Sequence, residues 1–481
     1  MRTNLKTLIV ESDELAKMDA VETAARIRAR ELSAVEVVAA AIERAEALNP
    51  LLNAIPASDY ARALERAKNP LAGPFAGVPT FIKDLDDVAG VVTSYGSRAH
   101  LDNVPKRTDR FIAKILDTGL VCLGKSAASE FGLTGTTESS AHGPTCNPWK
   151  TTHSPGGSSG GAAALVAAGV VPVAQGSDGG GSIRIPASFC GLIGLKVSRE
   201  RRFTTAILDK LPLRIVAYGV VSRTVRDTAH FVAALDQRVA SRRLSRMPVI
   251  DGPGTRRLRM AVFTQTPTGI PTDPEVRASV IAAADRCAGF GHLVEEIPCP
   301  FDSQTVEDFL MYWSLLAWGT IVQTRLQRGR RFDIDQMEPW TRGLAARFTS
   351  NRLGALAALR RLRAHSAIGH LFEKYDALIS PVSTAPAPEL GRLGPEVPFA
   401  TAFARVRDYF LFTPLQNVTG DPAISLPLGM SAGGLPIGVQ FIARQGHEAA
   451  LLELAYEFEG DGAFRSTAAR SGVSPACLPS A

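Results

Sequence analysis

The N-terminal part of the chain has the apolar spacing of helices. Apolar residues recur every three to four positions through residues 15–32, and a second helix is predicted to start at Ser33. Ser33 and Glu36 have the spacing of a capping box, which satisfies two backbone N–H groups at a helix start. The pair Asn49-Pro50 is expected to end this helix, because the residue before a proline is disfavoured in helical geometry.

The pattern changes between residues 73 and 234. Short apolar runs are separated there by glycines and by Ala-rich stretches of helical character. Residues 77–82 are predicted to form a buried strand that leads into Lys83, residues 111–118 a helix and residues 121–123 another strand. This alternation of strands and helices indicates an α/β sheet.

The rest of the chain resumes the alternation after a stretch without a clear period. Residues 199–259 are basic and irregular, so no regular element is predicted before their end. A strand, a helix capped by Thr272 or Asp273 and a second strand are then expected to form a β-α-β unit. The expected elements are strand 258–263, helix 273–288, strand 293–297, a helical block at 304–373, and strands 377–379, 423–426 and 438–442.

The helical block also carries a set of large aromatic side chains. Such a set belongs to a core more often than to a ligand pocket, but one face of it could cover a site. Both interpretations stay open for Phe309, Tyr312, Trp313, Trp318 and Trp340.

Composition narrows the class of protein. The chain has 481 residues, of which 45% are hydrophobic and 21% charged, the profile of a soluble globular protein. The net charge of +6 is small for this length, and no nucleic-acid-binding module is recognisable. The basic run at residues 238–259 is interpreted as a solvated connector. We therefore expect no nucleic-acid partner.

The chain shows no membrane or secretion signal. Only three consecutive apolar residues precede the acidic residues near the N-terminus, too few for a signal peptide, and no stretch approaches the length of a membrane span. The six cysteines are widely spaced without a CxxC pair, which argues against a zinc site or a disulfide framework. We therefore expect a cytoplasmic protein whose cysteines are free thiols. The six cysteines are Cys122, Cys146, Cys190, Cys287, Cys299 and Cys477.

Three places carry residues that could do chemistry. Residues 155–161, Pro-Gly-Gly-Ser-Ser-Gly-Gly, precede an Ala-rich helix, so their serines lie near its positive end. Residues 176–186 follow an apolar run and place three consecutive glycines before Ser182; such a turn can direct several backbone N–H groups at one point. Lys83 ends an apolar strand, where burial would lower its pKa until the neutral amine acts as a base.

Each feature has a structural interpretation when taken alone. A glycine-serine turn is often only a turn, and a lysine after a strand is usually on the surface. Residues 156–160 also match the Gly-x-Ser-x-Gly nucleophile elbow, but residues 151–155 make a poor preceding strand. A phosphate loop is excluded because no Gly-Lys-Ser/Thr ends the run. The joint order and spacing of the three places raises the weight of the catalytic interpretation.

In that order and spacing, residues 77–196 resemble the amidase signature family almost throughout. The matching segments are residues 77–79 with Lys83-Asp84, 146–149, 156–161, 176–186 and 190–196, and later landmarks follow at 225–227 and 420–427. The resemblance implies a single large α/β domain, in which a central mixed, mostly parallel twisted sheet is covered by helices on both faces. Its expected divisions are an N-terminal helical segment at 1–66, a catalytic core at 67–240, a connector with a β-α-β unit at 241–300, a helical block over the substrate site at 301–373, and strands and a helix at 374–481 that complete the same sheet.

The resemblance also implies the site residues. It implies Ser182 as nucleophile, Ser158 as a cis-peptide serine that relays protons, and Lys83 as general base. The backbone N–H groups expected to bind the oxyanion are those of Gly179, Gly180, Gly181 and Ser182, and the supporting residues are Ser159, Asp178 and Arg184. Many relatives have a larger residue where this chain has Gly179, so glycine there is expected to loosen the turn or widen the acyl site. No metal or organic cofactor is implied.

The implied reaction is acyl transfer through a covalent intermediate. Its substrate class is expected to be small non-peptide amides, with carbamates and esters open to the same chemistry. Within the family the local sequence is most similar to aryl acylamidases, nylon-oligomer hydrolases and urethanases. Two alternatives remain: the glutaminase subunit of a tRNA-dependent amidotransferase, which passes ammonia to a partner chain, and a binding protein without activity. The sequence does not give an oligomeric state.

Overall fold

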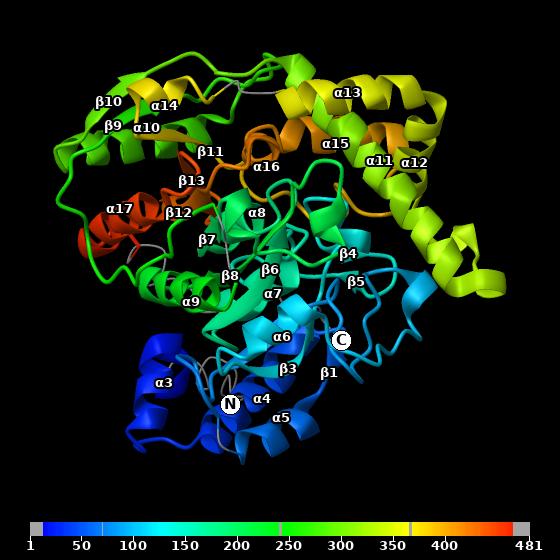
Figure 1. Cartoon of the computed structure of the whole chain (residues 1–481), viewed down its shortest axis with the longest axis vertical. Helices are drawn as coiled ribbons and strands as arrows, with labels where there is room; N and C mark the ends of the chain where they lie inside the picture. The colour runs from blue at the N-terminus through cyan, green and yellow to red at the C-terminus, as the bar shows by residue number, and fades with distance from the viewer. Residues whose placement is uncertain (1–12, 70, 240–242, 365–367, 465–481) are drawn as a thin grey trace, which may run out of the picture.

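The computed structural model describes residues 13–69, 71–239, 243–364 and 368–464, and its centre is an eight-stranded sheet (Figure 1). The expectations for residues 1–12 and for Cys477 fall outside the described residues. Most of the central strands are buried along their whole length, because helices cover both faces of the sheet. In spatial order the strands are β10 (Leu293–Glu296), β9 (Arg259–Val262), β11 (Ala377–Pro381), β13 (Pro436–Ala443), β12 (Ala423–Met430), β7 (Ile193–Lys196), β8 (Ala217–Ser222) and β6 (Val173–Asp178).

The sheet is mixed, as expected, but the expectation that it is mostly parallel is wrong. Among the described strands, the pairs β10–β9 and β9–β11 are parallel, whereas the five pairs from β11–β13 to β8–β6 are antiparallel. The turn at residues 431–435 joins β12 to β13 directly, and so short a connection can join only antiparallel neighbours. Among the described strands of the large sheet, parallel pairing is confined to β10, β9 and β11, of which β11 lies outside the predicted β-α-β unit.

A separate small sheet carries Lys83. Its order is β1 (Ala57–Ser58), β3 (Val121–Ser126) and β2 (Pro79–Lys83), so that Lys83 is the last residue of β2 and pairs with Ser126. Several hydrogen bonds join β2 to β6 at the edge of the large sheet; in two of them Thr80 Oγ1 donates to the Val173 carbonyl (3.0 Å) and the Lys83 N–H donates to Gln175 Oε1 (2.8 Å). They bring the end of β2 beside the end of β6. A two-stranded ladder, β4 (Glu138–Ser139) with β5 (Gly143–Pro144), lies nearby in the chain.

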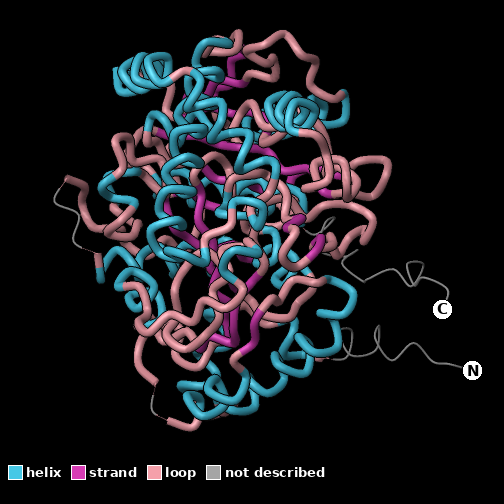
Figure 2. The backbone as a smooth tube through the Cα atoms, turned by 90° about the vertical axis from the view of Figure 1, so that its right-hand side faces the viewer, coloured by secondary structure: helices cyan, strands magenta, loops and turns pink. Residues whose placement is uncertain are grey.

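Helices pack on both faces of the large sheet, and Figure 2 shows the strands inside this helical cover. Consecutive residues of a strand point to opposite faces, and Val220 and Val221 of β8 accordingly belong to two different apolar clusters. The helices packed in the Val220 cluster include α6 (Arg110–Leu116), α9 (Val225–Arg238), α10 (Pro274–Gly289) and α17 (Glu448–Gly460). Those of the Val221 cluster include α4 (Ala34–Leu52), α5 (Tyr60–Ala67), α7 (Gly160–Ala167) and α8 (Arg184–Cys190).

The predicted helical block is present and lies at the upper right of Figure 1. Its long helix, α11 (Ser303–Arg328), packs against α12 (Pro339–Ser350) and α13 (Arg352–Ala364). Later segments add α14 (Leu371–Lys374), α15 (Phe399–Tyr409) and α16 (Pro414–Thr419); α15 packs on α12, and α16 on α11. Of these elements, α11, α12, α15 and α16 line the pocket that Gly180 and Ser182 of the glycine-rich turn also line.

Three local predictions need correction, and each has a physical cause. Residues 15–32 form two helices, α2 (Glu14–Lys17) and α3 (Ala20–Arg28), because Asp19 caps the start of the second. Helix α4 runs through Pro50 to Leu52, since a proline in the last turn removes a single hydrogen bond. Residues 199–259 are not all irregular, since they contain β8 and α9.

The other strand and helix predictions are confirmed. The capping box at Ser33 and Glu36 is present, and Asp273 caps α10. The expected strands at 77–82, 121–123, 258–263, 293–297, 377–379, 423–426 and 438–442 appear as β2, β3, β9, β10, β11, β12 and β13. The chain thus forms one large α/β domain with helices on both faces of a mixed sheet.

Candidate active site

Lys83 lies buried at the end of β2 and its amine faces two serines. The Nζ atom is 2.8 Å from Ser158 Oγ, 3.1 Å from Ser177 Oγ and 3.2 Å from the Ser177 carbonyl oxygen. Burial lowers the pKa of Lys83 to about 7, although the carboxylates of Asp86 and Asp178 act in the opposite direction. A large fraction of this amine is therefore neutral at neutral pH and able to accept a proton.

Ser158 stands directly before α7, where the glycine-serine segment passes through the interior. The peptide bond between Gly157 and Ser158 is cis, as the family resemblance implied. Glycine is required at 157, because a Cβ there would lie 2.3 Å from the carbonyl oxygen of Thr136. Ser159 is the N-cap residue of α7, and its hydroxyl donates to the Ser177 carbonyl (3.3 Å). The segment is thus packed tightly against the end of β6.

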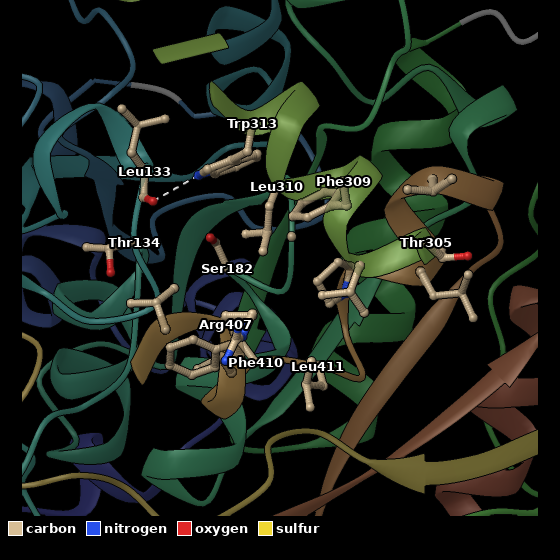
Figure 3. Close-up of a pocket in the computed structure, with 18 of the residues that line it drawn as sticks. Leu133, Thr134, Ser182, Thr305, Phe309, Leu310, Trp313, Arg407, Phe410 and Leu411 are labelled. Carbon is tan, nitrogen blue, oxygen red and sulfur yellow. Dashed lines mark hydrogen bonds between the residues drawn. The ribbon is translucent and has the colours of Figure 1, made fainter. Parts of the chain in front are cut away.

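Ser182 stands in the turn between β6 and α8, and its side chain lines a pocket. The residue is 7% exposed, and among the described residues its hydroxyl has no hydrogen-bond partner. Gly132 lies between this pocket and the Lys83–Ser158 hydrogen bond, because it also lines the pocket and a Cβ on it would lie 3.2 Å from Ser158 Oγ. Figure 3 shows the Ser182 hydroxyl at the pocket surface, with Trp313 above it. The structure therefore hydrogen-bonds Lys83 to Ser158 and places Ser182 in the wall of a pocket that Gly132 also lines.

The turn that carries Ser182 is held by a buried ion pair. Arg184 Nη2 and Nε each lie 2.9 Å from one carboxylate oxygen of Asp178, and both side chains are fully buried. Burial opposes ionisation of Asp178, but the Arg184 charge outweighs it and holds the pKa of this carboxyl below its usual range. Arg184 also donates to Gln440 (2.6 Å) and Asn417 (2.7 Å). The two residues predicted to brace the turn are thus joined to β13 and α16.

The four backbone N–H groups of the turn differ in their surroundings. The Gly181 N–H donates to Asp178 Oδ1 (2.8 Å), while the carbonyl of the same peptide, that of Gly180, accepts from Thr413 Oγ1 (2.7 Å). This peptide is therefore fixed at both its donor and its acceptor. In the described part of the chain the N–H groups of Gly179, Gly180 and Ser182 have no protein acceptor.

A second carboxylate lies behind Lys83. Asp86 is 3% exposed; its Oδ1 accepts from Tyr218 Oη (2.5 Å) and its Oδ2 from Gln175 Nε2 (3.1 Å). Gln175 in turn accepts the backbone N–H of Lys83. Burial raises the pKa of Asp86 to about 6, so the group is mostly ionised at pH 7. Its negative charge favours the protonated form of Lys83.

The pocket itself is apolar and is formed mostly by the second half of the chain. Phe309 and Trp313 of α11 stack with ring centroids 5.4 Å apart, and Trp340 of α12 closes another side. Both interpretations of the aromatic set hold: these three rings line the pocket, while Tyr312 is buried and Trp318 packs against Phe348. The lining residues are Gly132, Leu133, Thr134, Gly135, Gly180, Ser182, Ile185, Phe301, Thr305, Val306, Phe309, Leu310, Trp313, Trp340, Val406, Arg407, Phe410, Leu411, Pro414, Leu415 and Val418.

Sequence reasoning missed several residues that shape this site. Thr413 and Asn417 hold the glycine turn from more than 230 positions away, and no local pattern marks them. The loop at Gly132 and Leu133 was missed for the same reason. Asp86 had a signal, since it belongs to an acidic run directly after a buried strand.

Among the described residues, no group of three or more His, Cys, Asp or Glu side chains is arranged as metal ligands would be. None of the helices within residues 13–464 that the structure describes has the length and apolar character to cross a membrane.

Comparisons with known proteins agree with this architecture. A family model described as Amidase matches residues 36–452. AmiC of Mycobacterium tuberculosis, itself assigned only provisionally as an amidase, is 42% identical over 454 residues, which cover 93% of this chain and 95% of that protein.

Solved structures of two related enzymes superimpose on nearly the whole chain. A 6-aminohexanoate cyclic dimer hydrolase complexed with substrate has a TM-score of 0.83 at 31% identity, covering 93% of this chain and 97% of that one. A bacterial aryl acylamidase has a TM-score of 0.82 at 25% identity, covering 95% and 99%. With the family model and the AmiC relative, these matches show that the chain belongs to the amidase family, the amidase signature hydrolases whose motifs it carries.

Proposed function

We propose that this protein hydrolyses the C–N bond of small non-peptide carboxamides through an acyl-enzyme on Ser182. The observation that carries the proposal is the 2.8 Å hydrogen bond between Lys83 Nζ and Ser158 Oγ, buried beside the pocket that Ser182 lines. A general base must contact the hydroxyl that it deprotonates, and an amine with a pKa of about 7 can accept that proton at neutral pH.

The reaction proceeds in two acyl-transfer steps. Neutral Lys83 takes the proton of Ser158 while Ser158 takes that of Ser182, and Ser182 Oγ attacks the substrate carbonyl carbon. The tetrahedral intermediate collapses as the C–N bond breaks, and the proton returns through Ser158 to the leaving nitrogen, which departs as a neutral amine. Water then attacks the ester carbonyl by the same proton path, and the acid is released with Ser182 restored.

The negative oxygen of each intermediate needs donors that do not have to reorganise. The N–H groups of Gly179, Gly180 and Ser182 are the ones available to it, because the Gly181 N–H donates to Asp178. We assign Asp178 and Arg184 the role of holding the turn in this shape.

The pocket supports an amide of apolar substituents over the glutaminase alternative. Glutamine carries an ammonium and a carboxylate, whereas Arg407 is the one charged side chain among the described pocket-lining residues. The related cyclic-dimer hydrolase and aryl acylamidase also act, by name, on non-peptide amides. Carbamates and esters place the same carbonyl before Ser182, and we include them in the proposed range.

Two measurements test the proposal. After treatment with phenylmethylsulfonyl fluoride, peptide mass spectrometry should find the label on Ser182; label on another serine refutes the assignment. Purified enzyme should hydrolyse an anilide, a dialkyl carbamate and a p-nitrophenyl ester, and activity confined to the ester contradicts the amidase function. Ser182→Ala should abolish all three activities, whereas Ser350→Ala, at an exposed serine of α12, should change none.

A further inference from the structure

The aromatic pair of α11 rests directly on the glycine turn. A Cβ on Gly179 would lie 3.3 Å from Cη2 and 3.4 Å from Cζ3 of Trp313, and a Cβ on Gly180 would lie 3.0 Å from Cζ of Phe309. The two rings therefore fill the space that side chains at 179 and 180 would occupy. This contact places a flat aromatic face immediately beside the nucleophile turn.

The Trp313 ring is also held by a hydrogen bond to the loop that carries Leu133. Trp313 Nε1 donates to the carbonyl of Leu133 (2.9 Å), and Trp340 Nε1 donates to the same oxygen (2.9 Å). A carbonyl that accepts two indole N–H groups holds both rings in one orientation. Figure 3 shows the Trp313–Leu133 bond at the edge of the pocket above Ser182. The aromatic wall is thus preorganised rather than mobile.

We propose that the Phe309–Trp313 face selects substrates with a planar aromatic group bonded to the scissile amide. Glycines at positions 179 and 180 make this selection possible, because side chains there would displace the two rings. This inference rests on the proposed amidase function and names its substrate class. A flat ring can pack against the part of Trp313 that lines the pocket while its carbonyl lies over the turn, since aromatic rings attract each other most in offset or edge-to-face geometry. A saturated ring of the same size lacks that attraction and is thicker.

Two matched substrate pairs separate planarity from size. Benzamide and cyclohexanecarboxamide differ in the ring on the acyl side, and acetanilide and N-cyclohexylacetamide differ in the ring on the amine side. For each pair the ratio of kcat/KM, flat over saturated, is measured in wild type and variants. The change in this ratio on mutation cancels the intrinsic reactivity of the two substrates.

Trp313→Leu is expected to lower the flat-over-saturated ratio of at least one pair by about three- to tenfold, the range expected for one aromatic contact. The control is Trp318→Leu, the same substitution on the same helix at a half-buried tryptophan that packs against Phe348 and does not line the pocket. It should leave both ratios unchanged.

Two further variants keep the test decisive if Trp313→Leu folds poorly. Trp313→Phe retains a ring and removes the indole N–H, so it should keep part of the preference. Gly179→Ala displaces the Trp313 ring by a few tenths of an ångström and should lower the same ratio in the same direction.

The outcomes are distinct. The inference is overturned if Trp313→Leu and Trp318→Leu change the flat-over-saturated ratio equally. It is also overturned if no variant at position 313 or 179 changes this ratio. Either result leaves the amidase function standing. A wild-type enzyme that hydrolyses none of the four amides overturns both.

Discussion

Replacing Asp86 by Asn should make the enzyme more active in mild acid. The Asp86 carboxylate lies behind Lys83 and stabilises its ammonium form, which cannot act as a base. Asparagine keeps the shape of the side chain and can still accept from Tyr218, but its amide nitrogen cannot accept from Gln175 Nε2, so the substitution removes the charge and one hydrogen bond. Without that charge, burial of the amine is less opposed, and the pKa of Lys83 should fall below about 7.

The magnitude follows from the fraction of neutral amine. With a pKa of about 7, roughly a tenth of the Lys83 amine is neutral at pH 6 in the wild type. Removing a nearby opposite charge lowers a pKa by about one unit or more. In Asp86→Asn about half of the Lys83 amine should therefore be neutral at pH 6. The ratio of activity at pH 6 to the activity on the plateau above pH 8 should therefore rise about fivefold. The assay is the pH profile of kcat/KM for one amide, whose acid limb reports the free enzyme.

The neighbouring residue supplies the control. Asp87 accepts from Tyr95 Oη (2.8 Å) and is half-buried, and its charge does not act on Lys83 in the way that Asp86 does. Asp87→Asn should leave the acid limb in place. If Asp86→Asn leaves the limb unmoved or shifts it to higher pH, then the carboxylate does not set the pKa of the base and the reasoning fails.

Three other substitutions have defined outcomes. Thr413→Val removes the hydroxyl that holds the Gly180 carbonyl, and kcat should fall about fivefold with KM little changed, as expected for one neutral hydrogen bond; a thermal melt monitors folding. Gly132→Ala puts a Cβ 3.2 Å from Ser158 Oγ, at a residue whose φ is +71°. Activity and melting temperature should both drop, and the backbone conformation alone should lower the free energy of unfolding by about 1–2 kcal/mol. Burial and the neighbouring Glu130 carboxylate raise the pKa of Glu338 to about 8, so the folded state keeps a proton that the unfolded state releases near pH 4.5. Between these two pH values the wild type should therefore lose stability relative to Glu338→Gln as the pH rises. Urea denaturation of both proteins across this range measures the difference.

The fold could be predicted wherever a local rule fixes it. Ser33 with Glu36, and Asp273 before Pro274, announce helix starts through side chains only a few residues away, and both caps form. Strand direction has no such local signal, because a strand that is buried on both faces reads the same in either direction. The sheet was therefore predicted as mixed, but the antiparallel run from β11 to β6 could not be.

The candidate site shows the same division. Lys83, Ser158 and Ser182 stand next to apolar strands and glycines, and these neighbours mark them in the sequence. The partners that shape the turn do not carry such marks: Thr413 reads as an ordinary residue before a proline, and Trp313 as one aromatic residue among several. Their roles depend on packing between segments more than 130 residues apart, which periodicity does not report.

The proposed reacting groups and most of the pocket lining come from different parts of the chain. Residues 83–184 supply the amine, both hydroxyls and the turn, whereas most of the pocket lining comes from residues 301–418. Because the glycine turn has no side chains at 179–181, whatever α11 places against it becomes the surface beside the proposed nucleophile. A substitution on that helix can therefore alter which substrate fits without touching the hydrogen bond from Lys83 to Ser158. The turn's own shape is less free, since α16 holds the Gly180 carbonyl and Asp178 holds the adjacent N–H.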